Sequence, residues 1–371
     1  MKPNIILVLL DGSRTDRLSL SDKFLDLQKK GTLLNNVTAA YPYTFAALNA
    51  IFTGLFGKEN GVDAYYKMFK LKDSVPFLPE ILKNNGYFTT CDLISNKVIS
   101  NRGFDIYQSH DEYVDDLTKK HPEFLRDCFA KRKEKPLFTF LQFSRIHTVT
   151  VSEVLKKYDW DDKKYYENIQ QNLQNYDKVF AEAVNYANII HKTINELDKS
   201  NQTIIIFFCD HGTGVGERFG ERNYGVFTYE ETIKTFYLFI GPKISKNKKS
   251  DEMLTTLQIF PTILELSGID TKSLTLETSV ASFLNSKSTN LKGKPFTFSE
   301  TGGLQGPFPS PKSPNVFCVK TNEFKLIFQK SSETWELYDL KNDPTEQNNL
   351  YGKNLKIESV LQKKLLDWIN R

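Results

Sequence analysis

The chain has 371 residues, 40% of them hydrophobic and 25% charged, which is typical of a globular protein with a large core. Its 49 basic and 45 acidic side chains nearly balance, so charge alone gives no reason to expect binding to nucleic acid or a membrane surface. Its four cysteines are scattered without metal-ligand or redox spacing, and we therefore expect reduced thiols in a cytoplasmic protein.

The first predicted strand, Ile5–Leu10, is apolar throughout, as is typical of a central strand in a parallel sheet. The run is too short for the core of a signal peptide, and no other stretch approaches the ~20 apolar residues that cross a bilayer. Asp11 and Gly12 follow the strand. An Asp here is commonly a turn or helix-cap residue, but open α/β sheets also bind ligands beyond the carboxyl ends of their strands.

A helix is predicted to begin at Thr44, because helix formers occupy residues 46–52 and Gly54 then ends the segment. Thr44 is therefore either a simple N-cap or a hydroxyl placed where a helix N-terminus attracts a phosphate or sulfate. Further helices are expected at residues 22–30, 76–85, 176–198 and 254–266.

The run Thr203–Cys209 is the clearest buried strand, and Asp210 and His211 follow it directly. Gly212 then allows a sharp turn. A carboxylate and an imidazole at the end of a central strand are well placed to bind a metal ion.

Another apolar strand, Leu137–Phe143, is followed by Arg145 and His147. These two side chains either meet an anion beyond the strand or lie in an ordinary exposed loop.

Strands alternate with helices over residues 1–285, which predicts an α/β domain with a doubly wound, mostly parallel sheet flanked by helices. Over residues 286–371 the pattern changes to short strands and one closing helix. We therefore predict a small C-terminal antiparallel sheet capped by a helix. The expected strands are 296–298, 316–319, 324–328 and 334–338, and the expected helix is 357–369.

Several segments, in this order, resemble the sulfatase family of the alkaline phosphatase superfamily. The first strand with Asp11 is similar to the family's N-terminal signature, and Thr44 to Gly54 is similar to its nucleophile segment, C/S-x-P-S-R-x-x-x-x-T-G. Asp210 and His211 are similar to its second metal segment. Later landmarks are Tyr229-Glu230-Glu231, Gly241-Pro242, Phe260–Leu264 and Trp335–Pro344. The resemblance spans nearly the whole chain and implies the same α/β fold.

The chain departs from the family at the nucleophile. Sulfatases use a formylglycine made from Cys or Ser, and Thr44 cannot give this aldehyde. Ala46 and Leu48 replace the Pro and Arg that guide the conversion, and Gly12 replaces the second Asp of the usual pair. The lysine or histidine expected before Tyr229 is not evident.

The remaining set resembles the single-metal sites of the phosphoethanolamine and glycerophosphate transferase branch. The resemblance implies one divalent ion (Mn, Zn, Mg or Ca) held by Asp11, Thr44, Asp210 and His211. Thr44 would be the nucleophile, because coordination lowers the pKa of its hydroxyl and lets it form a phosphothreonine. A second ion would need a carboxylate and two further histidines, so we expect a single ion.

His147 also resembles the family's substrate-contacting histidine, and we assign His147 and Arg145 to the leaving group or the anion. The sequence therefore predicts a metal-dependent hydrolase or transferase that acts on a phosphate mono- or diester. Two alternatives stay open: a sulfate ester hydrolase that works without formylglycine, and a catalytically degenerate fold kept for binding. The expected partner is a small anionic ester on a sugar or lipid head group, not nucleic acid, and the oligomeric state is undefined.

Overall fold

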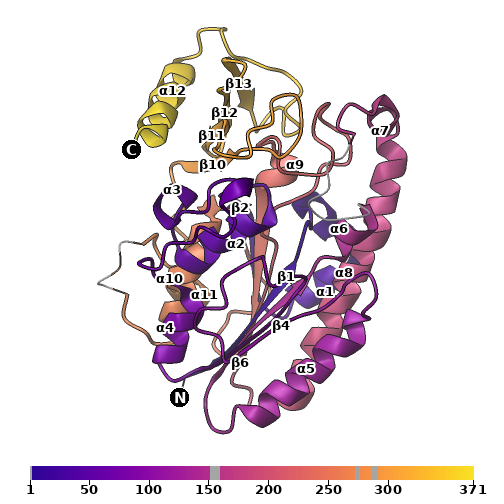
Figure 1. Cartoon of the computed structure of the whole chain (residues 1–371), viewed down its shortest axis with the longest axis vertical. Helices are drawn as coiled ribbons and strands as arrows, with labels where there is room; N and C mark the ends of the chain where they lie inside the picture. Colours follow the sequence, from indigo (N-terminus) through magenta and orange to yellow (C-terminus); the bar gives the residue numbers. More distant parts are fainter. Residues whose placement is uncertain (1, 151–158, 272–273, 275, 286–290) are drawn as a thin grey trace.

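The computed structural model describes residues 2–150, 159–271, 274, 276–285 and 291–371. Figure 1 shows a large unit, in which helices cover both faces of a sheet, and a small C-terminal unit at one end of it. The predicted boundary at residues 285 and 286 adjoins residues 286–290, which lie outside the described part, and it stays a prediction.

The large unit is built on a nine-stranded sheet. Its strands are β1 (Asn4–Leu10), β2 (Thr32–Thr38), β3 (Phe88–Leu93), β4 (Ile106–Ser109), β5 (Leu137–Phe143), β6 (Thr203–Phe208), β7 (Lys234–Ile240), β8 (Lys248–Ser250) and β9 (Leu254–Thr255). The order is β4-β3-β5-β1-β6-β7-β2-β8, with β9 paired to β2. The first five strands in this order are parallel, and β7 runs antiparallel between β6 and β2. The mostly parallel α/β sheet predicted from the sequence is confirmed.

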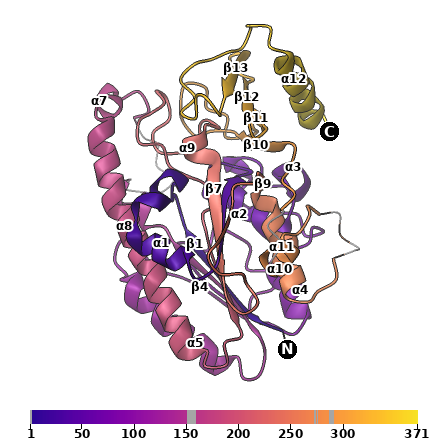
Figure 2. The same ribbon diagram turned by 180° about the vertical axis from the view of Figure 1, so that it is seen from behind.

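Two layers of helices cover this sheet, as Figures 1 and 2 show from opposite sides. One layer contains α1 (Asp22–Gln28), α5 (Leu117–Lys131) and α8 (Ile169–Leu197), and the other contains α2 (Thr44–Thr53), α4 (Leu78–Asn84), α10 (Ile259–Leu266) and α11 (Ala281–Asn285). Strand β1 shows why both layers are needed: Ile5, Leu7 and Leu9 face one apolar core, and the alternate residues face the other.

The shorter helical elements lie in the connections. They are α3 (Gly57–Asn60), α6 (Arg145–Thr150), α7 (Lys163–Glu167), α9 (Glu230–Ile233) and the 3₁₀ turns Thr15–Leu20, Tyr65–Lys67 and Thr256–Gln258.

Some elements differ from the sequence-based expectation. Strand β2 was not predicted, because two asparagines interrupt its apolar pattern and the register shifts between Leu34 and Val37. Helix α5 was also missed, because Pro122 lies inside it and its mean character is polar. The helix predicted to begin at residue 254 begins at Ile259, after β9 and a 3₁₀ turn.

The small unit is an antiparallel sheet of β10 (Thr297–Thr301), β11 (Val316–Lys320), β12 (Phe324–Gln329) and β13 (Thr334–Asp339), packed against α12 (Lys356–Ile369). This arrangement is as predicted. Ala46, Ala47 and Ala50 of α2 share an apolar cluster with Val319 and Trp368 of the small unit. The helix that carries Thr44 is therefore held between the large sheet and the small unit.

A buried ionic network also joins the two units. Nζ of Lys325 on β12 lies 2.6 Å from Oε1 of Glu346 and 3.2 Å from Oε1 of Glu230, and it donates a 2.9 Å hydrogen bond to the Thr228 carbonyl. Nζ of Lys320 on β11 lies 2.8 Å from Oε2 of Glu230. Burial works to raise the pKa of Glu230, but the neighbouring lysines lower it well below its usual value.

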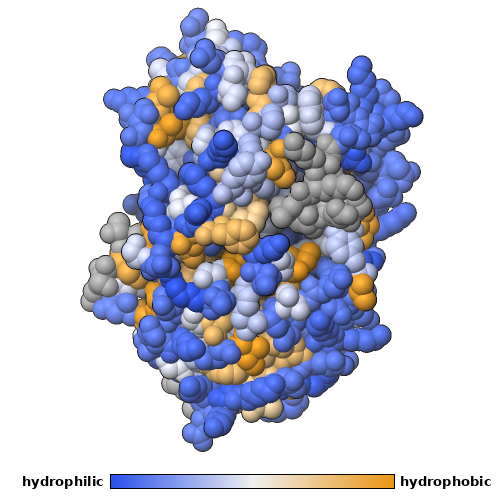
Figure 3. All heavy atoms as spheres, viewed as in Figure 1, coloured by the Kyte–Doolittle hydropathy of each residue, from blue (hydrophilic) through white to orange (hydrophobic). Residues whose placement is uncertain are grey.

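Within the described residues, no helix is long and apolar enough to span a bilayer. On the face shown in Figure 3 most side chains are hydrophilic, and the apolar ones form small groups.

Replacing Lys325 with Met should lower the free energy of unfolding by about 3–5 kcal/mol, because buried carboxylates lose their counter-charge. Lys330→Met, at an exposed lysine just beyond β12, is the matched control and should change it by less than about 0.5 kcal/mol. Urea unfolding of both variants measures the difference. Equal losses in the two variants would contradict a structural role for the network.

Candidate active site

The predicted site residues meet at the carboxyl ends of three neighbouring strands. Asp11 follows β1, and Asp210 and His211 follow β6, the parallel neighbour of β1. His147 lies in α6, just beyond β5 on the other side of β1. All four side chains are buried, with exposed fractions of 0–2%. The parallel pairing of β5, β1 and β6 is thus what brings these groups to one edge of the sheet.

Nε2 of His211 is the atom on which this group converges. It lies 3.1 Å from the Thr44 hydroxyl, 3.7 Å from Oδ1 of Asp11 and 3.8 Å from Oδ2 of Asp210. Its other ring nitrogen, Nδ1, is 2.8 Å from the carbonyl of Gly212 and donates to it, which leaves Nε2 unprotonated and facing the three oxygens. Thr44, Asp11, Asp210 and His211 are therefore close enough to share one ion.

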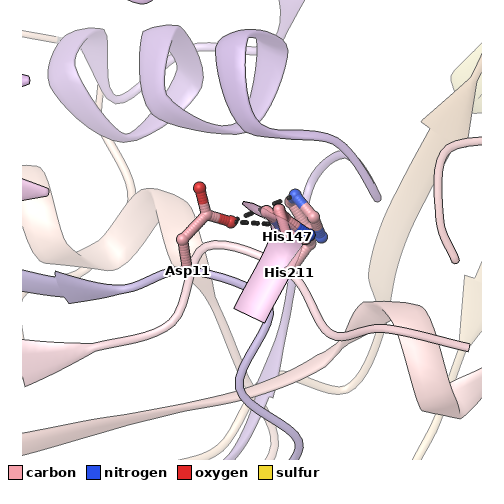
Figure 4. A group of neighbouring side chains, drawn as sticks. All are labelled: Asp11, His147 and His211. Carbon is pink, nitrogen blue, oxygen red and sulfur yellow. Dashed lines mark hydrogen bonds and ion pairs between the residues drawn. The ribbon is translucent and has the colours of Figure 1, made fainter. Parts of the chain in front are cut away.

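Asp11 has the most hydrogen-bond partners of the group. Nε2 of His147 lies 2.6 Å from its Oδ1, and Figure 4 shows this oxygen turned toward both imidazoles. Its Oδ2 accepts from the Gln142 amide at 3.2 Å and from the Ser144 hydroxyl at 3.1 Å. The carboxylate is thus fixed in place by donors that follow or belong to β5.

The environment shifts the pKa values of the two aspartates in opposite directions. Burial favours a raised pKa for Asp11, but the charge and hydrogen bond of His147 outweigh it and lower the pKa to about 2. Burial and the nearby charge of Asp11 raise the pKa of Asp210 well above its usual value. Oδ2 of Asp210 is buried and has no hydrogen-bond partner among the described residues. A cation bound beside this oxygen would give it a partner and offset the repulsion between the two aspartates.

His147 occupies space that Gly12 leaves open. A Cβ atom on Gly12 would lie 2.8 Å from Cε1 of His147 and 2.7 Å from Oγ1 of Thr213. The φ angle of Gly12, +76°, also lies in the left-handed region that favours glycine. Gly12, in the place where an aspartate was expected from the resemblance, thus makes room for an imidazole beside Asp11.

Thr44 is partly exposed, whereas Asp11, His147, Asp210 and His211 are buried. It is the first residue of α2, whose first backbone bond runs from the Ala47 N–H to the Tyr43 carbonyl. The N–H groups of residues 44–46 therefore precede the helix ladder and, with the helix dipole, favour an anion at this end. The ring of Tyr224 lies 4.4 Å from that of His147 and 4.9 Å from that of His211, and covers both imidazoles.

Arg145 is not brought into this group. It begins α6 with its side chain half-exposed, and its Nε lies 3.4 Å from Oε2 of Glu182 on α8. The anion-binding role expected for Arg145 thus has no support in its position, whereas His147 lies in the group itself.

Gln142 and Ser144 hold Asp11 but received no role in the sequence analysis. Gln142 is a polar residue in the otherwise largely apolar strand β5 and is only 1% exposed. This break in the apolar pattern was a signal that could have identified it, because a buried amide needs hydrogen-bond partners.

Comparison with known proteins gives the family. The family model described as "Sulfatase" matches residues 3–269, which is most of the chain. The chain belongs to the sulfatase family. A second model, "N-sulphoglucosamine sulphohydrolase, C-terminal", matches residues 221–371. The resemblance drawn from the sequence motifs is confirmed, and the enzymes of this family hydrolyse ester bonds.

Curated relatives match about half of this sulfatase-family chain. A Delta 4,5-hexuronate-2-O-sulfatase of Bacteroides thetaiotaomicron is 28% identical over 200 residues, which cover 51% of this chain and 40% of the relative. An N-acetylglucosamine-6-O-sulfatase of the same species is 27% identical, over 52% of this chain and 33% of the relative. Arylsulfatase K of Bos taurus is 28% identical, over 48% and 33%. The matches thus span only about a third to two fifths of the relatives' length.

Solved structures share the fold over the whole chain. A protein solved with its substrate D-glucosamine-2-N,6-O-disulfate has a TM-score of 0.76 and 18% identity, and covers 99% of this chain and 97% of its own. The phosphonate monoester hydrolase of Agrobacterium radiobacter has a TM-score of 0.78 and 15% identity, with 99% and 95% covered. At these identities the likeness establishes the alkaline phosphatase-like fold alone.

Sulfatase-family proteins typically bind a divalent metal ion, and the residues present fit one. Asp11, His147 and His211 each offer a ligand atom within 4.8 Å of the others, and the unpaired Oδ2 of Asp210 adds a fourth. These separations approach those between the ligands of a tetrahedral ion.

Replacing Gly12 with Ala should weaken metal binding by about 10- to 100-fold, because the added methyl displaces His147 from Asp11. Gly268→Ala is the matched control: its φ is +69° and a Cβ there meets nothing within 4 Å, so it has the backbone strain without the contact. Titration with Mn²⁺, followed by electron paramagnetic resonance, measures both affinities. Equal affinities would show that His147 does not need the space at Gly12.

Proposed function

We propose that this chain is a metal-dependent sulfate ester hydrolase that uses the hydroxyl of Thr44 as its nucleophile and acts on a small anionic sugar. The observation that carries the proposal is the Thr44 hydroxyl, at the N-terminus of α2 and 3.1 Å from Nε2 of His211. The substrate class is suggested by curated relatives named as hexuronate and N-acetylglucosamine sulfatases.

The reaction follows from the position of Thr44. Its proton has an acceptor in the Asp11 carboxylate, whose oxygens lie 3.3 and 3.4 Å away, and its oxygen bonds to the sulfur of the ester. The S–O bond to the sugar breaks, and the sugar oxygen leaves as an alcohol after taking up a proton. Water then attacks the sulfated threonine, which releases sulfate and restores the hydroxyl.

The N-terminal N–H groups of α2 stabilise negative charge on the sulfuryl oxygens during both steps. Asp11, Asp210, His211 and His147 would hold the metal ion, which when bound supplies Lewis acidity. Two imidazoles beside two carboxylates favour Zn²⁺ or Mn²⁺ over Ca²⁺, which prefers oxygen ligands.

A second candidate is hydrolysis or transfer of a phosphate ester at the same threonine. It is favoured by the residue itself, because a threonine hydroxyl cannot become formylglycine and forms a phosphothreonine by the same attack. We rank the sulfate ester first because the curated relatives are named as sulfatases. The two candidates differ only in the group transferred.

Thr44→Ala should lower kcat for hydrolysis of a sulfate ester by about 10⁴-fold or more, because it removes the nucleophile. Thr44→Ser keeps the hydroxyl and should retain most of the activity. The assay compares 4-nitrophenyl sulfate and sulfated disaccharides with the corresponding phosphate mono- and diesters. High-resolution mass spectrometry of quenched reactions should find sulfate on Thr44.

Faster turnover of phosphate esters, with phosphate on Thr44, would replace the first candidate with the second. Activity unchanged in Thr44→Ala would refute both. No turnover of any ester by metal-loaded protein would favour a binding role.

A further inference from the structure

A second cluster of titratable side chains lies behind the active site, on the far side of β5. Asp92 lies in β3, His110 follows β4, Glu112 lies in the next loop, and His121 lies in α5. Their side chains are 0–1% exposed, so four groups that normally contact water are enclosed in the protein. Such groups are costly to bury unless each finds a partner.

Both imidazoles are held by one ring nitrogen only. Nδ1 of His110 lies 2.7 Å from Oδ1 of Asp92, and Nδ1 of His121 is hydrogen-bonded to the hydroxyl of Tyr186. Nε2 of each ring has no hydrogen-bond partner among the described residues, and neither does Oε1 of Glu112. Histidines that bind metal usually hold their other nitrogen against a carboxylate or another oxygen in this way, which leaves the free nitrogen for the ion.

Each unpartnered nitrogen lies near a carboxylate oxygen that already accepts one hydrogen bond, Oε2 of Glu112 from the Ser144 N–H and Oδ2 of Asp92 from the Gln108 amide. Nε2 of His110 is 3.7 Å from Oε2 of Glu112, and Nε2 of His121 is 4.0 Å from Oδ2 of Asp92. Ligand atoms of Asp92, His110 and His121 all lie within 4.8 Å of one another. Zn–N bonds of about 2.0–2.1 Å place the ligands of a tetrahedral zinc roughly 3.4 Å apart, so a small contraction of the cluster would form such a site.

We propose that Asp92, His110 and His121, together with Glu112, form a second, enclosed metal site that binds Zn²⁺. Two imidazoles and two carboxylates are a ligand set that zinc accepts. All four side chains are buried, as is typical of structural zinc sites, in which protein ligands fill every coordination position. A simple ion pair of His110 with its two carboxylates would leave Nε2 of His121 without a partner. The proposal does not depend on the reaction assigned to Thr44.

The same contacts indicate what the ion would do. Oε2 of Glu112 accepts a 2.7 Å hydrogen bond from the Ser144 N–H, and the Ser144 hydroxyl donates to Asp11. An ion that fixes Glu112 would therefore also fix the residue that holds Asp11. Glu112 also lines a surface cavity of about 630 Å³, bordered by Arg145 and Glu182, which gives a path from solvent to the edge of the cluster.

The test measures zinc by mass spectrometry in the whole 371-residue chain, after it has been loaded with Zn²⁺ and freed of excess. The starting variant is Asp210→Asn/His211→Ala, which disables the active-site ion. It should retain one zinc per chain. Adding His121→Ala should remove that zinc, whereas adding His191→Ala should not. His191 is the matched control, because it is a largely buried histidine on α8 that contacts Asn195, outside the cluster.

A starting variant that retains no zinc, or equal retention in the His121→Ala and His191→Ala proteins, would overturn the proposal. If the His121→Ala protein fails to fold, X-ray absorption of the zinc-loaded starting variant decides. Scattering from two imidazoles supports the site, and a spectrum without imidazole ligands refutes it.

Discussion

The carboxylate of Asp11 is the constraint on which the site depends. It is buried at the end of the central strand and accepts hydrogen bonds from His147, Gln142 and Ser144. A buried carboxylate without such partners would be strongly destabilising. The register of β1 between β5 and β6 supplies these partners and also places His211 within reach.

Gly12 and Thr44, at this edge of the sheet, both differ from the residues that the family resemblance led us to expect. Gly12 leaves open the space that His147 occupies, so an imidazole stands beside Asp11 where the family resemblance led us to expect a carboxylate. Thr44 keeps a hydroxyl at the head of α2, at the position where sulfatases carry a formylglycine precursor. The chain thus keeps the fold of the family, and at this edge of the sheet it places an imidazole and a threonine hydroxyl where the resemblance led us to expect a carboxylate and a formylglycine precursor.

Strand β5 lies between the active-site residues and the second cluster of Asp92, His110, Glu112 and His121. Ser144, at its end, links Asp11 on one side to Glu112 on the other through one hydroxyl and one backbone N–H. The small C-terminal unit also affects the site. It packs against α2, which carries Thr44, and it is joined to the large unit through the ion pairs of Lys325. The position of Thr44 therefore depends on both units.

The sequence by itself determined the fold class, the central strands and four of the residues that meet around His211, because apolar runs and the polar residues that end them are local patterns. Its first choice of a phosphate ester was drawn from the likeness of Asp11, Thr44, Asp210 and His211 to single-metal transferase sites, and the relatives favour the sulfate alternative. Strand β2 and helix α5 were missed because their patterns are interrupted by asparagines and a proline. Only the tertiary structure decided that Arg145 turns to Glu182, that His147 fills the space at Gly12, and that His110 and His121 meet. Such contacts join residues far apart in the chain, and their distances depend on how strands and helices pack, which no local pattern records.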